Sequence, residues 1–142
     1  MNFPRETELA LLIDRFMRRI HFKLRANAAQ FDVKSVGRNG GMTLLTIADT
    51  DRISLHDLTE RMARDKSQMT RAIKALEQKG LVARETAPDD ARVSLVFLTA
   101  DGKEVVAQLR DALTKVIDEI LEPISTADKA ELKTLLNQAL NR

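Results

Sequence analysis

One segment near the middle of the chain changes the spacing of its apolar residues from helical to extended. Asp65 is a typical N-cap and Gly80 a typical residue just past a helix end, so we expect a helix between them. Two extended stretches follow at residues 81–84 and 93–98, separated by the turn-forming residues 87–91. The inward face of the helix consists of Met69, Ala72, Ile73 and Leu76. The chain must therefore adopt a fold in which one small hairpin directly follows a helix.

Apolar residues at helical spacing flank this segment on both sides. Upstream we expect a long helix over residues 5–31, a glycine-rich break at residues 33–42 and a second helix over residues 42–48. Downstream we expect a long helix that ends at Pro123 and a further, terminal helix. The side chains expected to cap helices are Ser54, Asp65, Thr99 and Ser125. This order predicts a mainly α (α+β) fold: a winged helix-turn-helix with a small β-hairpin wing, flanked by helices at both ends.

Composition excludes several functional classes. The net charge is only +2 in 142 residues, so nucleic-acid binding would depend on where the charges lie rather than on a polybasic tail. The chain has no cysteine, which excludes disulfides, thiolate nucleophiles, Cys-based zinc sites and thiol redox switches. No apolar run approaches the roughly 20 residues of a membrane helix. Arg5, Glu6 and Glu8 also interrupt any signal-peptide pattern. We therefore expect a soluble, cytoplasmic protein that makes no contact with a membrane.

The outward face of the helix after Asp65 carries side chains that suit the major groove of DNA. Between Lys66 and Lys79 there is a charge excess of +3, with Glu77 as the single acid. Glutamine can bond adenine, arginine can bond guanine, and short hydroxyl residues reach phosphates or thymine methyl groups. The candidate DNA-contacting residues are Lys66, Ser67, Gln68, Thr70, Arg71 and Lys74. A solvated face of an ordinary amphipathic helix is the alternative interpretation, and the helix alone does not decide between the two.

The expected hairpin adds an independent indication. Its tip contains Asp90 and Arg92, two residues apart and directly before the second extended stretch. An arginine on a protruding hairpin can enter the narrow minor groove, where the negative potential is strongest. Asp90 could orient the Arg92 guanidinium by a charge-assisted bond. Surface ion pairs of this kind are common, so the motif indicates DNA binding only together with the preceding helix.

Taken together, these segments resemble the MarR/SlyA family of bacterial transcription regulators. The resemblance rests on the ordered segments Ile53–Leu58, Asp65–Arg71, Leu76–Val82, Pro88–Arg92 and Leu98–Gly102. It implies a homodimer whose two recognition helices read a palindromic operator in double-stranded DNA while the wings lie in adjacent minor grooves. It further implies a repressor relieved by a small phenolic or anionic ligand, whose binding residues remain unknown. Three residues depart from the family pattern. Ala63 and Arg64 stand where the family often has glycine and then an aliphatic residue, and Val93 stands where a second basic residue is common.

The resemblance also divides the chain by role. Residues 1–34 and 100–142 are expected to be dimerisation helices, which fits their apolar stripes, and residues 35–99 to be the DNA-binding domain. Ser54 and Arg64 are candidates for phosphate contacts. Two alternatives remain: a winged-helix module for protein–protein contact, and a DNA-binding protein that senses no ligand. Salt-dependent binding to duplex DNA would separate the first from a regulator.

Other polar clusters favour ordinary surface roles. His56 and Glu60, with Asp57 beside them, have a spacing that can hold a metal, but a solvated helix face is the more common explanation. The sequence has no phosphate loop and no GxSxG motif, so we expect no enzyme, no cofactor and no metal. The basic run from Arg15 to Arg25 has five cations and no acid. We favour a solvated helix flank there over a DNA-backbone contact or a rim that binds an anionic effector.

Overall fold

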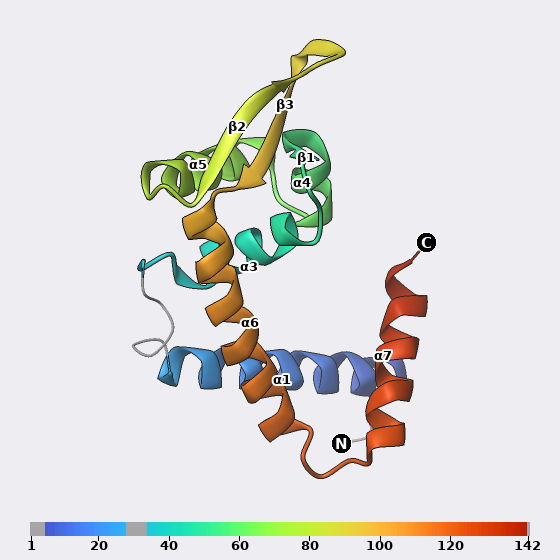
Figure 1. Ribbon diagram of the computed structural model, residues 1–142. Coiled ribbons are helices and arrows are strands. Elements are labelled where there is room, and N and C mark those ends of the chain that lie inside the picture. Colours follow the sequence, from blue (N-terminus) through green and yellow to red (C-terminus); the bar gives the residue numbers. More distant parts are fainter. Residues whose placement is uncertain (1–4, 28–33, 142) are drawn as a thin grey trace. The chain divides into compact units, whose positions relative to one another are not determined.

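The computed structural model describes residues 5–27 and 34–141 (Figure 1). These residues form two compact units. The terminal-helix unit contains residues 5–27 and 112–141, and the winged lobe contains residues 34–111. No helix within these ranges is both long enough and apolar enough to cross a membrane.

The winged lobe is a helix-turn-helix followed by a small antiparallel sheet. Its elements in chain order are α3 (Gly37–Ala48), β1 (Ile53–Ser54), α4 (Leu55–Arg61), α5 (Lys66–Gln78), β2 (Val82–Ala87), β3 (Asp90–Leu98) and the first half of α6 (Ala100–Ile120). The strand order is β1-β3-β2, and both pairings are antiparallel. The hairpin of β2 and β3 projects beyond the helices of the lobe (Figure 1). The predicted winged helix-turn-helix is confirmed.

The predicted helix caps are all present. Each capping oxygen accepts a hydrogen bond from the backbone N–H three residues later, which satisfies a donor that the helix itself leaves unpaired. The pairs are Ser54 with Asp57 at 3.0 Å, Asp65 with Gln68 at 2.8 Å, Thr99 with Gly102 at 3.1 Å and Ser125 with Asp128 at 3.0 Å. The short polar residues read from the sequence therefore set where these helices begin.

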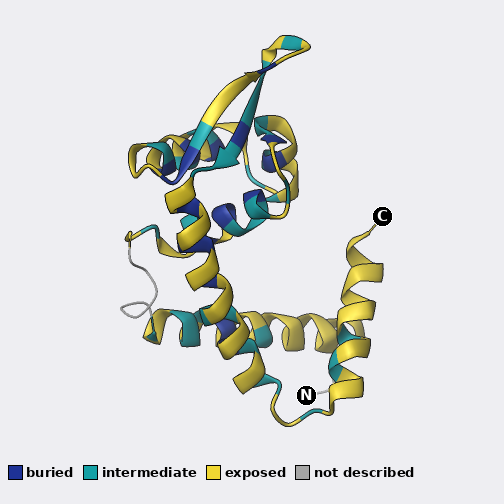
Figure 2. Cartoon of the chain, in the orientation of Figure 1, coloured by how far each residue is buried: buried dark blue, intermediate teal, exposed yellow. Residues whose placement is uncertain are grey.

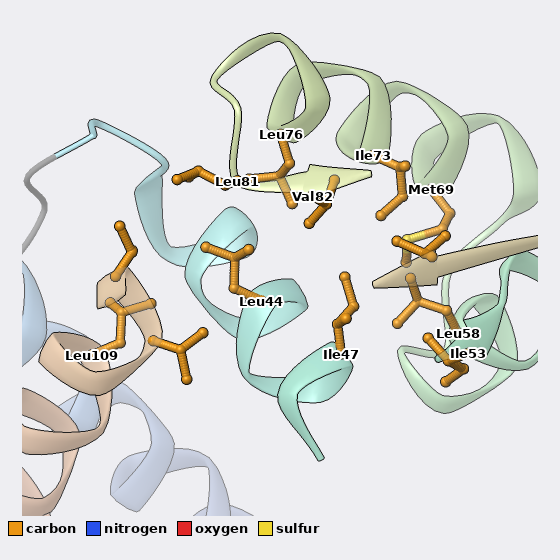
Figure 3. Close-up of a cluster of buried hydrophobic side chains, with 13 residues drawn as sticks. Leu44, Ile47, Ile53, Leu58, Met69, Ile73, Leu76, Leu81, Val82 and Leu109 are labelled. Carbon is orange, nitrogen blue, oxygen red and sulfur yellow. The ribbon is translucent and has the colours of Figure 1, made fainter. Parts of the chain in front are cut away.

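The lobe has a continuous hydrophobic core. In Figure 3, side chains from α3, α5 and the sheet converge on one another. Leu44, Leu58 and Ile73 have no exposed surface, and neither does Met69, which comes from the helix predicted to face DNA. Burying side chains of this size contributes about 1.5–3 kcal/mol each. The inward half of α5 is thus committed to the core, which leaves only its opposite half for other contacts.

The predicted break at residues 33–42 is too long, because α3 begins at Gly37 and continues through Gly40 and Gly41. Residues 34–36 do lie outside a helix, and residue 33 is outside the described residues. Gly41 is buried, and a Cβ atom there would lie 3.5 Å from the side chain of Leu109 in α6. A Cβ atom on Gly40 would lie 3.0 Å from the Cβ of Val36. The glycines therefore allow close packing, and that packing offsets the roughly 1 kcal/mol by which glycine disfavours a helix.

The first helix is shorter than expected. The helix α1 (Arg5–Ala26) ends before a turn at Asn27, whose side-chain amide donates to the carbonyl of Lys23 at 2.9 Å. The rest of the predicted helix, residues 28–31, lies outside the described residues.

The strands of the hairpin are longer than predicted. β2 extends to Ala87 and β3 begins at Asp90, and the two-residue strand β1 was not predicted at all. Ala87 and Asp90 have weak strand preferences and β1 has only two residues, but cross-strand pairing provides partners for their backbone groups. Pairing between distant segments, which periodicity does not report, therefore sets the extent of the sheet.

The terminal-helix unit consists of α1, the second half of α6 and α7 (Thr126–Leu140). Among its described residues, the buried hydrophobic side chains are Ile20 and Val116, and α7 has none. Figure 2 shows α7 and most of α1 as exposed. Large exposed apolar side chains on these two helices are Leu9, Leu11, Leu12, Ile13, Met17, Phe22, Leu135, Leu136 and Leu140.

Candidate nucleic-acid interface

The outer face of α5 presents a row of polar and cationic side chains. The exposed residues on this face are Ser67, Gln68, Arg71 and Lys74. Because Met69, Ile73 and Leu76 fix the inner face in the core, these side chains can only point away from the lobe. Four of the six candidates from the sequence thus share one exposed surface. Lys66 is also exposed, at the first position of the helix, but it lies on the same stripe as Met69 and Ile73.

Thr70, the sixth candidate, is half-buried. Its Oγ1 donates to the carbonyl of Lys66 at 2.8 Å. That bond uses the hydroxyl proton and leaves the oxygen as an acceptor. Thr70 is therefore suited to accept a hydrogen bond from a partner rather than to donate one.

The cationic character of α5 is kept because its single acid is paired elsewhere. Glu77 forms an ion pair with Arg84 of β2, at 2.7 Å between Glu77 Oε1 and Arg84 Nε. Within residues 5–27 and 34–141, Lys66, Arg71 and Lys74 form no ion pair. The Glu77–Arg84 pair also joins α5 to the wing, a role that the sequence pattern did not indicate.

Lys79, at the end of α5, has a structural contact as well as a charge. Its ammonium donates to the carbonyl oxygens of Lys34 and Ser35, at 2.7 and 3.4 Å. Ser35 has a φ of 53°, a conformation that costs a non-glycine residue about 1–2 kcal/mol. Lys79 therefore holds the segment before α3 against the end of α5.

The tip of the wing carries the predicted pair. Asp90 Oδ1 accepts from the Arg92 backbone N–H at 3.0 Å and lies 3.4 Å from Arg92 Nε. The Arg92 side chain is 91% exposed, so the contact orients the guanidinium without covering it. The strand register shifts between Thr86 and Ala87, and Ala87 is the residue that pairs with Asp90. Such irregularities increase local twist and change where a side chain points.

The two candidates for phosphate contact lie in the helix-turn-helix. Ser54 is half-buried and uses an oxygen lone pair to cap α4, which leaves its hydroxyl proton available to an acceptor. Arg64 is half-buried in the turn before α5. The preceding residue, Ala63, has a φ of 50°, in the left-handed region that favours glycine.

Two other clusters from the sequence are also present. His56, Asp57 and Glu60 have ligand atoms within 4.8 Å of one another, but all three residues are exposed, and His56 Nε2 lies 3.3 Å from Glu60 Oε1. In the basic run, Arg18 pairs with Asp14 at 2.9 Å and Lys23 with Glu119 at 3.1 Å. These contacts are typical of solvated helix faces and contribute little to stability.

Comparison with known proteins gives one family for this chain. Residues 39–94 match the MarR family. The chain is 33% identical over 101 residues to the uncharacterised HTH-type transcriptional regulator YdgJ of Bacillus subtilis, covering 70% of this chain and 62% of that protein. It therefore spans less than two thirds of the length of this relative.

Solved structures show the same fold. A mutant of MarR from E. coli, complexed with operator DNA, has a TM-score of 0.77, with 24% identity and 94% of each chain covered. PcaV from Streptomyces coelicolor, in complex with its natural ligand, has a TM-score of 0.76, with 18% identity and 99% of this chain and 97% of that chain covered. Residues 39–94 are thus similar to the MarR family, and the chain has a MarR-like winged helix-turn-helix fold.

Proposed function

We propose that this protein is a sequence-specific DNA-binding transcription regulator in which α5 reads the major groove and the wing contacts the minor groove. The observation that carries the proposal is the outer face of α5, where Gln68 and Arg71 are exposed, and the cations Arg71 and Lys74 form no ion pair within the described residues. Both residues lie in the first half of the helix, the part that meets base edges in helix-turn-helix proteins. The exposed Arg92, oriented by Asp90, supplies the second contact.

The active species in this proposal is a homodimer. The exposed apolar side chains of α1 and α7 gather on the helices with the least buried surface, and a second copy of the chain would cover them. A closed two-fold dimer presents two copies of α5, which suits a palindromic site. Residues 1–34 and 100–142 are accordingly assigned to dimerisation and residues 35–99 to DNA binding.

Repression relieved by a small ligand is the finer part of the proposal. The E. coli MarR mutant was solved with operator DNA, and PcaV was solved with its natural ligand. Both share the fold of this chain at less than 25% identity. They support a regulator that binds an operator and responds to a small ligand, and the family resemblance alone suggests that this effector is phenolic or anionic. MarR proteins are not enzymes, in agreement with the sequence analysis.

The test is the salt dependence of binding to duplex DNA. A regulator that neutralises phosphates should show a linear fall of log K with log salt, and operator DNA should bind more tightly than a scrambled duplex. Selection from a random duplex pool supplies the operator sequence for this comparison. A chain that binds neither selected nor scrambled DNA at low salt would contradict the proposal and favour a protein–protein module.

A further inference from the structure

The apolar contacts that attach the wing to the lobe lie at the base of the wing, residues 82–84 and 96–98. Val82 and Val96 belong to the hydrophobic core, whereas no hairpin residue from 83 to 95 does. Arg84 pairs with Val96 across the strands, so it stands where the hairpin leaves the core. Beyond this point the hairpin projects from the helices of the lobe (Figure 1). The position of the wing tip therefore depends on what holds the base.

An ion pair joins the base of the wing to α5. Arg84 Nε lies 2.7 Å from Glu77 Oε1, an oxygen that has essentially no exposed surface and no aligned hydrogen-bond partner within the described residues. The two groups therefore interact through their charges. Because a covered carboxylate oxygen without a nearby cation is costly, Glu77 favours positions of β2 that keep Arg84 beside it.

A second set of contacts ties the three strands together at the base of the wing. Arg52, directly before β1, forms an ion pair with Glu85 of β2, and its guanidinium lies 4.3 Å from the centre of the Phe97 ring of β3. These contacts span the sheet in its strand order β1-β3-β2. Successive residues of a strand point to opposite faces, so Glu85 and Arg84 hold opposite faces of β2. A shift of β2 at Arg84 would therefore move the whole hairpin.

We propose that Glu77 and Arg84 are positioning residues, which set the wing relative to α5 so that Arg92 reaches DNA when α5 lies in the major groove. This rests on the proposed function, because it concerns the spacing between two DNA contacts. Three further residues of β2 follow Arg84, so the tip lies about 10 Å beyond the pair. A tilt of about 10° at the base would move the tip by about 2 Å, a large shift for a side chain that enters a minor groove roughly 6 Å wide.

A purely electrostatic role for Glu77 predicts a different change in binding. Removing an acid from α5 would by charge alone tighten binding to every duplex. If Glu77 positions the wing, Glu77→Gln also releases the hairpin, and a long duplex loses the advantage that wing contact gives it over a short duplex trimmed of its flanks. The ratio of the two affinities separates these roles, because a general change in protein charge affects both duplexes and largely cancels.

The first experiment uses the full chain without DNA. Amide order parameters from NMR relaxation should fall between residues 86 and 94 in Glu77→Gln, and Arg84→Met should give the same fall. Amide shifts elsewhere in the lobe should match the wild type, which shows that both variants are folded. Glu104→Gln is the matched control: Glu104 is an exposed acid of the same lobe without an ion pair among the described residues, and its substitution should leave the wing amides unchanged.

The second experiment measures the affinities of the long and the trimmed operator duplex. Glu77→Gln and Arg84→Met should each lower the ratio about threefold, the scale of a partly exposed ion pair. Arg92→Ala should lower the ratio in the wild type and have a smaller effect in Glu77→Gln, because the released wing has already lost much of its contact. The charge-reversed double variant, Glu77→Arg with Arg84→Glu, should restore both the ratio and the order parameters.

The two experiments distinguish failure of this proposal from failure of the proposed function. Wing amides that loosen in a chain that binds no DNA would contradict the proposed function while confirming that the pair sets the wing. In a chain that binds DNA, unchanged order parameters in both single variants would overturn the proposal, as would an unchanged duplex ratio. A charge-reversed variant that restores neither quantity would also overturn it, because the pairing itself would not be responsible.

Discussion

The winged lobe buries its large apolar side chains within the chain, whereas the terminal helices leave many of theirs exposed. In the lobe, α3, α5 and the sheet bury side chains such as Leu44 and Ile73 entirely within one chain. In the terminal-helix unit, Leu12 and Ile13 remain 52% and 54% exposed, and α7 buries nothing. The lobe therefore closes its hydrophobic core within one chain, whereas the terminal helices leave an apolar surface exposed, which a second copy would cover in the proposed dimer.

This difference also separates the two parts of the proposed function. DNA contact needs exposed polar groups on a rigid support, and the closed core of the lobe provides that support. Dimerisation needs exposed apolar groups, and the terminal helices provide those. Mutations on the DNA-facing surface of the lobe should therefore leave the proposed dimer intact, whereas mutations that break the dimer should also weaken operator binding.

The largest effect is expected from Ile13→Glu in α1. In the proposed dimer the new carboxylate would be buried without a partner, at a cost of several kcal/mol in each copy. Sedimentation should show a 16.0 kDa species where the wild type is twice that mass, and operator binding should be lost. Thr7→Glu, an exposed polar position on the same helix, is the control and should remain dimeric. A dimeric Ile13→Glu protein would contradict the assignment of α1 to the interface.

Gly102→Ala tests the close packing between the start of α6 and the backbone of Leu81 in the lobe. A Cβ atom there would lie 2.0 Å from the carbonyl oxygen of Leu81, which is backbone and cannot rotate away. Urea unfolding should show a loss of about 3 kcal/mol. Gly41→Ala is the matched control, since its Cβ meets Leu109 at an ordinary 3.5 Å, and it should gain up to about 1 kcal/mol. Equal effects of the two substitutions would contradict the packing described.

Gln68→Ala and Arg71→Ala test the sequence-reading part of the lobe. Each should change discrimination between operator and altered base pairs by about 1–3 kcal/mol, because the bidentate contacts to one base would be lost. Selection from a random duplex pool measures this preference directly. Unfolding and sedimentation should match the wild type because both side chains are exposed. Recovery of the same operator by all three proteins would rule out a reading role for these residues.

Arg92→Ala tests the wing. Binding should weaken about equally for all duplex sequences, and the slope of log K against log salt should fall by about one unit, because one phosphate-neutralising cation is lost. Lys115→Ala, in the terminal-helix unit, serves as the control for a general loss of one positive charge. An unchanged slope in Arg92→Ala would mean that the wing does not touch DNA.

The smallest effect is expected at the turn before α5. Ala63→Gly removes the strain of a left-handed backbone at φ 50°, offset in part by the greater freedom of glycine in the unfolded chain. Thermal unfolding should show a gain of about 0.5 kcal/mol or less. A clear loss of stability would mean that the Ala63 methyl group makes contacts that outweigh the strain.

Local signals were the easiest to read from the sequence. Ser54, Asp65, Thr99 and Ser125 were predicted as caps, and each accepts the expected backbone hydrogen bond. The outward face of α5 followed from helical periodicity, since fixing Met69 and Ile73 inward fixes Gln68 and Arg71 outward. These features depend on neighbours within about one helical turn, which a single sequence displays directly.

Capping residues and periodicity did not predict the contacts between different elements. Glycines at 40 and 41 predict a break when considered alone, but α3 forms because Leu109 of α6 packs against Gly41. β1 exists only because Ile53 pairs with Val96, and the pair of Arg84 with Glu77 requires the wing to lie beside α5. The Gly41–Leu109 contact and the Ile53–Val96 pair each join segments that are tens of residues apart in the sequence.

The sequence by itself determined the order of the helices and the hairpin, the starts of the four capped helices and the polar face proposed to read DNA. Tertiary structure decided which glycines lie within a helix and how far the sheet extends. The physical reason is the range of the interactions. Caps and periodicity are local, whereas close packing and strand pairing depend on the energy gained when remote segments come together.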